Sequence, residues 1–205
     1  MLFRSDRAPA FRLRDGNGDT VSSDDLLCIG PVLIVFYKGR WYPYCNLDLS
    51  AIQSASGDIR SAGASIVAVS EQRPADSLET VRMNGLSFPS LVDGRGKLAS
   101  AFGLRWKASA ELGAVLGRRG AGLTFLHDEQ SGTVVMPARY IVAPDGTMEY
   151  VDIRVDYARR GDPSDLFTVL DHLRTQSSPY RNPNATTGRD RSELPESVSV
   201  RPNRL

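Results

Sequence analysis

The chain contains few cysteines and histidines: Cys28, Cys45, His127 and His172 are the only four in 205 residues. Two cysteines are too few for the disulfide framework that holds small secreted domains together. A structural zinc site takes four cysteine or histidine ligands, and these four residues are widely separated in the sequence. We therefore expect no disulfide scaffold, no metal site and no bound cofactor.

The sequence also lacks an excess of charge and a long apolar segment. Its 25 Lys and Arg residues nearly balance 24 Asp and Glu residues, giving a formal net charge of +1, so we expect no nucleic-acid partner. No window approaches the roughly 18 apolar residues needed to span a bilayer. Residues 1–7 lack the apolar stretch of a secretory signal. We therefore predict a cytoplasmic protein with no membrane partner.

What is present is the composition of one globular domain. A hydrophobic fraction of 41% over 205 residues is enough for one α/β core. From Thr175 onward the composition changes to Ser, Pro, Asn and Arg with few large apolar residues, which is typical of an extension outside the core. The predicted organisation is one domain over residues 1–175 and a mobile tail over residues 176–205.

Local patterns predict the order of strands and helices. Short alternating or β-branched runs predict strands, and proline or serine ahead of spaced apolar residues predicts helices. The predicted strands are 11–14, 20–22, 31–37, 64–70, 88–92, 133–143 and 147–154. The predicted helices are 23–27, 43–63, 74–83, 96–102, 109–116 and 163–174. This order is typical of an α/β fold in which helices flank a central mixed sheet, here preceded by a β-hairpin.

Cys45 lies where a reactive cysteine is expected. A buried strand ends near Tyr37, and Pro43 suits the first position of the helix that follows, because no donor is needed there. Cys45 then sits in the first turn, beside unpaired backbone N–H groups and the positive end of the helix dipole. Both favour the nucleophilic thiolate. The local pattern fits a small apolar core residue equally well, and these two interpretations stay open.

The residues around Cys45 form a longer motif. The run from Phe36 to Asn46 reads Phe-Tyr-Lys-Gly-Arg-Trp-Tyr-Pro-Tyr-Cys-Asn. It resembles the Phe-Tyr-x-Gly-x-Trp-Cys-Pro-Tyr-Cys-Asn motif of the peroxiredoxin-like branch of the alkyl hydroperoxide reductase and thiol-specific antioxidant (AhpC/TSA) family. Further similar segments are 67–70, 88–93, 101–104, 136–142 and 155–160. The resemblance covers most of the chain, from about residue 8 to residue 174, and it implies a thioredoxin-like fold.

The resemblance also implies an activity. Cys45 occupies the position of the peroxidatic cysteine, which attacks the O–O bond of a peroxide and becomes a sulfenic acid. The implied partners are a hydroperoxide as substrate and an external thiol as reductant, and members of the family often form homodimers. Pro137 corresponds to a cis-proline that faces the active site, so the resemblance places it in the substrate-binding region.

Three positions depart from the family pattern. Tyr42 stands where the family has the first cysteine of Cys-Pro-Tyr-Cys, or the threonine of typical peroxiredoxins. Its hydroxyl lies several ångströms further from the backbone than that of threonine, so it does not simply replace it. Lys38 stands where a proline usually opens the motif. The usual arginine aligns near Pro137, and Arg139 points to the same face of its strand, so we predict that Arg139 takes its place among the catalytic residues with Cys45 and Tyr42.

Cys28 is the other thiol in the chain. It precedes the strand 31–37 and Cys45 follows it, so the rise of roughly 3.3 Å per residue separates the two by on the order of 20 Å. A disulfide needs Cα atoms within about 7 Å. We therefore interpret Cys28 as a structural thiol near the sheet edge, and we expect an external thiol or another subunit to resolve an oxidised Cys45.

Other residues have a functional and a plainer interpretation. Trp41, Tyr42 and Tyr44 either line a substrate pocket beside Cys45 or pack over the start of the helix. Glu71 follows a buried strand and is a candidate for shaping the pocket. The sequence His127-Asp128-Glu129 suits a metal or a general base, but a solvated turn is the favoured interpretation. His172 is expected on the last helix, as a surface or packing residue.

Three functions fit these observations. The first is a thiol-dependent peroxidase that uses Cys45 alone. The second is a divergent enzyme in which Cys45 and an aromatic pocket of Trp41, Tyr42 and Tyr44 act on an organic, biosynthetic substrate. The third is a non-catalytic binding module of the same fold. A disulfide oxidoreductase is disfavoured, because exchange within one chain needs a second sulfur close to the first.

Overall fold

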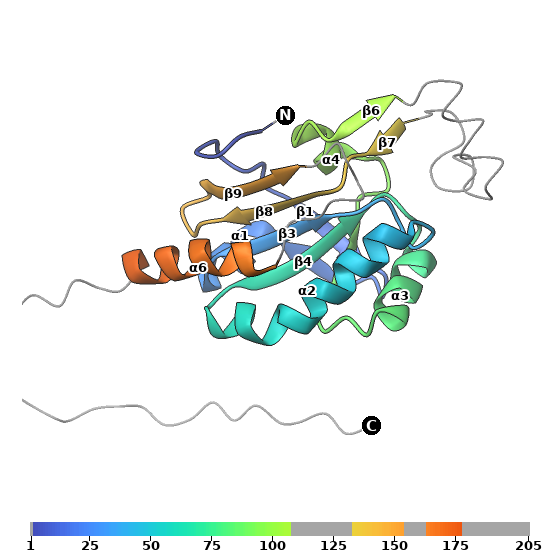
Figure 1. Ribbon diagram of the computed structural model, residues 1–205. Helices are drawn as coiled ribbons and strands as arrows, with labels where there is room; N and C mark the ends of the chain where they lie inside the picture. Colours follow the sequence, from blue (N-terminus) through green and yellow to red (C-terminus); the bar gives the residue numbers. More distant parts are fainter. Residues whose placement is uncertain (1, 108–132, 154–162, 178–205) are drawn as a thin grey trace, which may run out of the picture.

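The computed structural model describes residues 2–107, 133–153 and 163–177 of the chain. Most of the described strands form one mixed sheet in the order β2-β1-β5-β4-β3-β8-β9, and β6 and β7 form a separate two-stranded ribbon (Figure 1). The strands are β1 Arg12–Asp15, β2 Thr20–Ser22, β3 Val32–Phe36, β4 Ser65–Ser70, β5 Ser90–Val92, β6 Arg105–Lys107, β7 Thr133–Val135, β8 Ala138–Val142 and β9 Met148–Ile153. The helices are α1 Ser23–Ile29, α2 Pro43–Ser61, α3 Pro74–Met83, α4 Lys97–Ala101 and α6 Ser164–Ser177.

Strand β3 runs through the middle of this sheet. It pairs in parallel with β4, where Leu33 lies opposite Ile66, and antiparallel with β8, where Val35 lies opposite Arg139. All five of its residues are buried. A strand covered on both faces needs apolar side chains at every position, and this requirement explains the unbroken run of apolar residues in β3.

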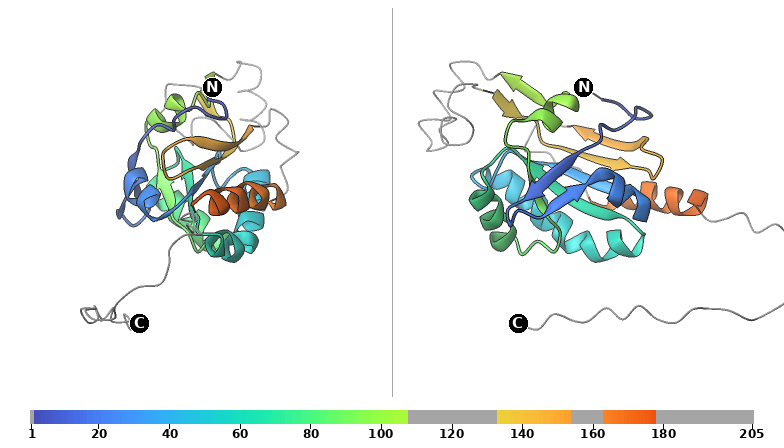
Figure 2. Two further views of the ribbon diagram at one scale, coloured as in Figure 1. Left: turned by 90° about the vertical axis from the view of Figure 1, so that its left-hand side faces the viewer. Right: turned by 180° about the vertical axis from the view of Figure 1, so that it is seen from behind.

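The pleat of β3 sends its side chains into two separate cores. Leu33 and Val35 pack in one core with buried residues of α2 and α6, among them Cys45. Val32, Ile34 and Phe36 pack in the other core with buried residues of α4, and α1 packs against that core as well. The left view of Figure 2 shows α1 and the pair α2 and α6 on opposite sides of the sheet. Cys45 and α1 therefore belong to different faces.

The structure confirms most of the predicted elements. Helix α2 begins at Pro43, as the proline predicts, and α3 has the predicted bounds. The N-terminal hairpin of β1 and β2 is present, with Leu13 opposite Val21. The predicted helix 109–116 and nearly all of the predicted tail 176–205 lie outside the described residues.

Two expectations for the segment 133–143 are wrong. It is not one strand: β7 ends at Val135 and pairs with β6, and β8 begins at Ala138. Proline has no N–H to continue a ladder, so the strand is interrupted at Pro137, and the N–H of Met136 donates instead to the carbonyl of Leu104 at 2.8 Å. The peptide bond before Pro137 is also trans rather than cis; trans is the lower-energy form of such bonds unless the surroundings select cis.

Candidate active site

Cys45 is the third residue of α2 and is almost completely buried, with 1% of its surface exposed. Tyr42, the residue that caps the helix, has extended backbone angles, and its carbonyl accepts the N–H groups of Cys45 at 3.0 Å and of Asn46 at 3.3 Å. Pro43 fills the first helical position, where its missing donor costs nothing. The local sequence thus fixes Cys45 in the first turn, directly after the loop that leaves β3.

The surroundings of the Cys45 sulfur favour negative charge. The backbone N–H of Lys38 donates to the Sγ atom at 3.4 Å. The side chain of Tyr42 makes no capping hydrogen bond, and the first turn of α2 holds no acidic residue. The positive end of the helix dipole therefore acts on the sulfur without a carboxylate in that turn to oppose it. Burial acts in the other direction, because a thiolate is poorly solvated in a core.

The loop between β3 and α2 is held by its neighbours. Gly39 has φ +145°, and the N–H of Tyr42 donates to its carbonyl at 3.2 Å, which closes a tight turn. Outside the turn, Asp76 of α3 accepts from Arg40 Nε at 2.9 Å and from Arg73 Nε at 3.0 Å. Partial burial would raise the pKa of Asp76, but hydrogen bonds from Arg40 and Arg73 outweigh it and hold the pKa below its ordinary range.

Arg139 lies on the face of the sheet that holds Cys45. It stands opposite Val35 in the β3–β8 pairing, and its guanidinium forms an ion pair with Asp48 of α2. The side chains of Arg139 and Asp48 are only 4% and 3% exposed. Asp48 follows Cys45 by three residues, which places the two on one side of the helix. The pair brings a buried positive charge to this face, and the catalytic role of Arg139 stays a prediction.

Asp48 was not anticipated from the sequence. One feature pointed to it: Asp48 lies between Cys45 and Leu49 on the buried side of α2. An acidic residue is rarely buried without a partner of opposite charge. Its partner is 91 residues away in the chain, and no local pattern identifies a contact over that distance.

Three aromatic side chains surround the start of α2. The rings of Trp41 and Tyr42 lie 5.3 Å apart, and those of Tyr42 and Tyr44 lie 5.7 Å apart. The ammonium group of Lys38 stands 4.6 Å from the centre of the Tyr42 ring. Tyr42 packs against the core that contains Cys45, whereas Tyr44 is 41% exposed. The three aromatic residues are therefore brought together, as both interpretations of them require.

Pro137 is buried and precedes Ala138, which pairs with Phe36. Side chains alternate along a strand, so Pro137 shares the face of Arg139 and lies towards the end of β3 from which the Cys45 loop departs. Its predicted place near the site fits this register, although its peptide bond is not the expected cis bond.

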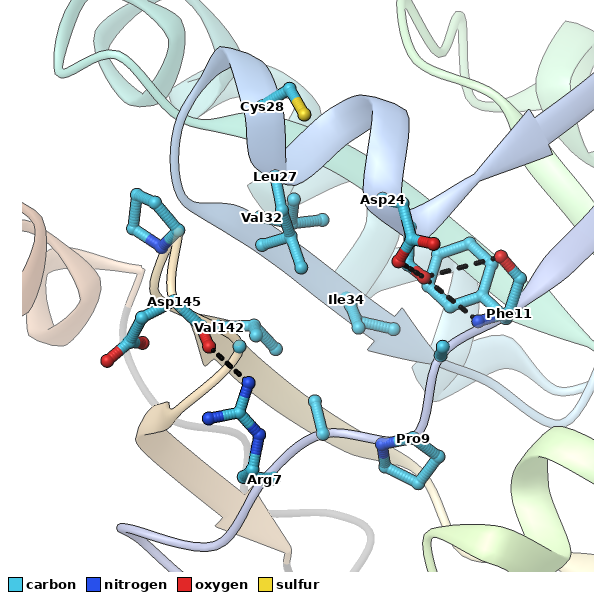
Figure 3. Close-up of a pocket in the computed structure, with 15 residues that line it drawn as sticks. Arg7, Pro9, Phe11, Asp24, Leu27, Cys28, Val32, Ile34, Val142 and Asp145 are labelled. Atoms are coloured by element: carbon cyan, nitrogen blue, oxygen red, sulfur yellow. Dashed lines mark hydrogen bonds between the residues drawn. The ribbon is translucent and has the colours of Figure 1, made fainter.

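Cys28 lies away from this site. It is exposed on α1, so its interpretation as a structural thiol is wrong, and no disulfide joins it to Cys45. It lines a pocket of about 440 Å³ whose floor includes Val32, Ile34 and Val142 (Figure 3). Val32 and Ile34 belong to the core on the other face of the sheet from Cys45. The inference that Cys28 does not resolve Cys45 agrees with this placement.

The remaining candidates have ordinary surroundings. Glu71 is buried, and its Oε1 lies 2.8 Å from Nε of Arg105. Burial raises the pKa of Glu71, and the charge of Arg105 offsets only part of that effect. His172 lies on α6, as predicted, and of the two interpretations its exposure favours a surface residue. The segment 127–129 lies outside the described residues.

Two kinds of feature are absent from the described ranges. Among residues 2–107, 133–153 and 163–177, no cluster of three or more His, Cys, Asp or Glu side chains is arranged to hold a metal ion. Of the helices in these ranges, none combines the length and the apolar character needed to cross a membrane.

Comparison of the sequence with known proteins identifies its family. Residues 5–151 match the model of the AhpC/TSA family. A Mycobacterium tuberculosis protein that is named as a peroxiredoxin is 33% identical over 149 residues, which are 71% of this chain and 89% of that protein.

Solved structures agree on the fold. The peroxidoxin BcpB of Mycobacterium tuberculosis has a TM-score of 0.65 at 19% identity, covering 85% of this chain and 98% of its own. The AhpC of Enterococcus faecalis has a TM-score of 0.63 at 21% identity, covering 85% of this chain and 94% of its own. The sheet with flanking helices is the thioredoxin fold of the peroxiredoxins. With the matched family model and the M. tuberculosis relative, this chain belongs to the AhpC/TSA family.

Proposed function

We propose that the protein is a thiol-dependent peroxidase in which Cys45 is the only redox residue. One observation carries the proposal: the Cys45 sulfur lies in the first turn of α2 and accepts the backbone N–H of Lys38 at 3.4 Å. A core cysteine needs no donor aimed at its sulfur, whereas a nucleophilic thiolate gains from one. Membership of the AhpC/TSA family gives the class of reaction.

The first step is attack of the Cys45 thiolate on the terminal oxygen of a hydroperoxide. An S–O bond forms and the O–O bond breaks, so the sulfur becomes a sulfenic acid and the alkoxide RO⁻ leaves, taking a proton to give ROH. With hydrogen peroxide the leaving group is hydroxide, which becomes water. We assign Arg139 to the charge that develops on the leaving oxygen, because its buried guanidinium lies on the Cys45 face and Asp48 fixes its position.

The second step needs a thiol from outside the chain. Cys28 is on the other side of the sheet and is not joined to Cys45. In the proposed cycle, a reductant R′SH attacks the sulfenic sulfur, releases water and forms a mixed disulfide. A second R′SH then releases the Cys45 thiol and R′SSR′. The two electrons that reduce the peroxide thus come from two external thiols.

The aromatic residues support a second candidate, a divergent enzyme acting on an organic substrate. Trp41, Tyr42 and Tyr44 form a continuous series of ring contacts beside Cys45. Tyr42 occupies the position of the family's threonine or cysteine, and its side chain packs against the core instead of making a capping hydrogen bond. In the peroxidase these rings form the wall of the substrate site, and in the second candidate they bind the substrate itself. The cytoplasmic location and the homodimer stay predictions.

Oxidation of reduced protein by a slight excess of hydrogen peroxide or cumene hydroperoxide tests the proposal. The sulfenic acid is trapped with dimedone and assigned to its peptide by mass spectrometry, with Cys45→Ser and Cys28→Ser as matched controls. We expect the Cys28→Ser protein to react as the wild type does and the Cys45→Ser protein to lose the fast reaction. Oxidation of Cys45 no faster than that of a free thiol at the same pH rejects the peroxidase.

A Tyr42→Thr variant separates the two candidates. If Tyr42 merely forms a wall, the variant keeps or gains peroxide reactivity, because a hydroxyl returns to the position where the family has one. A wild-type protein that is inert to both peroxides, together with a Tyr42→Thr variant that reacts, favours the enzyme with an organic substrate.

A further inference from the structure

A group of buried polar side chains lies beside the Cys45 loop. Its members share almost complete burial, with at most 3% of each exposed, and they are linked by hydrogen bonds: Tyr37, Gln72, Ser77, Thr80 and Ser90. Burial raises the pKa of Tyr37, although bonds from neighbouring hydroxyls partly offset it. Burying a polar group costs free energy unless it forms hydrogen bonds, and the side chains of this group form such bonds with one another.

Gln72 connects this group to the loop. Its Nε2 donates to Tyr37 Oη and to Thr80 Oγ1, each at 2.8 Å. These two bonds use both amide hydrogens and so fix the direction in which the carbonyl oxygen points. That oxygen, Oε1, accepts the backbone N–H of Arg40 at 3.0 Å. A side chain held by Tyr37, directly after β3, and by Thr80 of α3 therefore holds the middle of the loop.

The loop has little room to shift around this contact. Gly39 is buried, and a Cβ atom placed there would lie 3.1 Å from Gln72 Oε1 and 2.9 Å from the Trp41 ring. On the other side, Asn46 Nδ2 donates to the carbonyl of Arg40 at 2.7 Å. Both backbone groups of Arg40 are thus fixed, one by Gln72 and one by Asn46.

We propose that Gln72, together with Asn46, is a positioning residue for Cys45. The two side chains fix the backbone N–H and carbonyl of Arg40. They thereby hold the backbone just before Arg40 so that the N–H of Lys38 points at the Cys45 sulfur. Their effect on the reaction passes through the fraction of Cys45 present as thiolate. The inference rests on the proposed function for its purpose, but the geometry that it describes is measurable without any peroxide.

Other charges also act on Cys45, and they are left in place by the test. Lys38 belongs to the loop, Asp48 follows Cys45 on α2, and Arg139 reaches the same face from β8. Tyr37, the residue directly after β3, is uncharged, and burial raises its pKa further above the ordinary tyrosine value. Charged residues of α6, among them Asp171 and Arg174, are exposed. Since Gln72 and Asn46 are uncharged, replacing them with uncharged residues changes geometry and not the charge around the sulfur.

The test compares Gln72→Met with Ser77→Ala in a Cys28→Ser background. Methionine keeps the length of glutamine but removes all of its hydrogen bonds. Ser77 donates to the carbonyl and to the hydroxyl of Ser90, each at 2.8 Å, and does not contact Gln72 or Arg40 through any bond of this group. Ser77→Ala therefore disturbs the same buried group without releasing the loop. The readout is the pH dependence of Cys45 alkylation by iodoacetamide, with thermal unfolding measured in parallel.

We expect both variants to lose thermal stability and only Gln72→Met to shift the alkylation midpoint. Weakening the hydrogen bond from Lys38 to the charged sulfur should raise the midpoint by about one pH unit, a tenfold loss of thiolate below it. Equal shifts in both variants, or no shift in Gln72→Met, overturn the proposal.

Asn46→Ala keeps the proposal testable if Gln72→Met does not fold. Asn46 is partly exposed, and alanine is a good helix former, so this variant should stay folded. We expect a shift in the same direction, about threefold in thiolate below the midpoint, since one of the two contacts on Arg40 remains. An unchanged midpoint in folded Asn46→Ala overturns the proposal. Wild-type protein inert to peroxide, with the shifts present, rejects the peroxidase and leaves the positioning role standing.

Discussion

The ion pair between Asp48 and Arg139 allows a quantitative test of how the site is built. Both side chains are at most 4% exposed, so neither charge is solvated. Replacing Asp48 by leucine leaves the guanidinium buried without this counter-charge. Removing one partner of a buried pair costs about 3–5 kcal/mol, a large part of the roughly 5–15 kcal/mol by which a domain of this kind is stable. Replacing Arg139 by methionine should cost a similar amount, because the carboxylate is then the buried ion.

The double variant, Asp48→Leu with Arg139→Met, should recover most of that loss. It buries two apolar side chains and no charge, and such replacements are often neutral or stabilising. We therefore expect the double variant to lie within about 2 kcal/mol of the wild type, far from the sum of the single changes. Urea denaturation at pH 7, followed by circular dichroism, gives the four free energies of unfolding for this double-mutant cycle.

Two results would refute this reasoning. A single variant that loses less than about 1 kcal/mol would mean that the pair is as weak as one on the surface. A double variant that loses the sum of both single changes would mean that the two side chains do not interact. If the double variant is stable as expected but reacts slowly with peroxide, the charge of Arg139 serves the reaction rather than the fold.

Two further predictions concern backbone strain at two glycines and the buried carboxylate of Glu71. Gly96 has φ +60°, and a Cβ there would overlap the side chains of Arg105 and Glu71, whereas Gly18, with φ +94°, has open space around it. We expect Gly18→Ala to cost about 1 kcal/mol of unfolding free energy from backbone strain alone, and Gly96→Ala to cost clearly more; equal losses by urea denaturation would contradict this. The raised pKa of Glu71 means that its protonated form fits the folded state better. Its contribution is therefore fully present below the ordinary glutamate pKa and is lost as pH rises through the higher folded value. Relative to Glu71→Gln, the wild type should lose stability as pH rises above the ordinary glutamate pKa, and a difference that is constant with pH would count against it.

The sequence predicts what depends on neighbours along the chain. The start of α2 follows from Pro43, and the face of Arg139 follows from the two-residue period of a strand. The contacts between remote segments were not predictable. Asp48 meets Arg139 across 91 residues, and Gln72 meets the Arg40 backbone across 32. Such pairs depend on how the helices settle on the sheet, which no local pattern records.

The two cysteines also allow the argument about Cys45 to be tested by their order of reaction. Cys28 is exposed and Cys45 is 1% exposed, so accessibility alone makes Cys28 the faster thiol towards every reagent. Thiolate character makes Cys45 the faster one towards a reagent small enough to reach it. We therefore expect the bulky disulfide reagent DTNB to modify Cys28 first and hydrogen peroxide to oxidise Cys45 first, as followed by peptide mass spectrometry in the wild type and in each single serine variant. The expected reversal rests on the helix start and the Lys38 N–H, since both favour the thiolate of Cys45. If both reagents modify Cys28 first, Cys45 is a core residue and the peroxidase proposal fails with it.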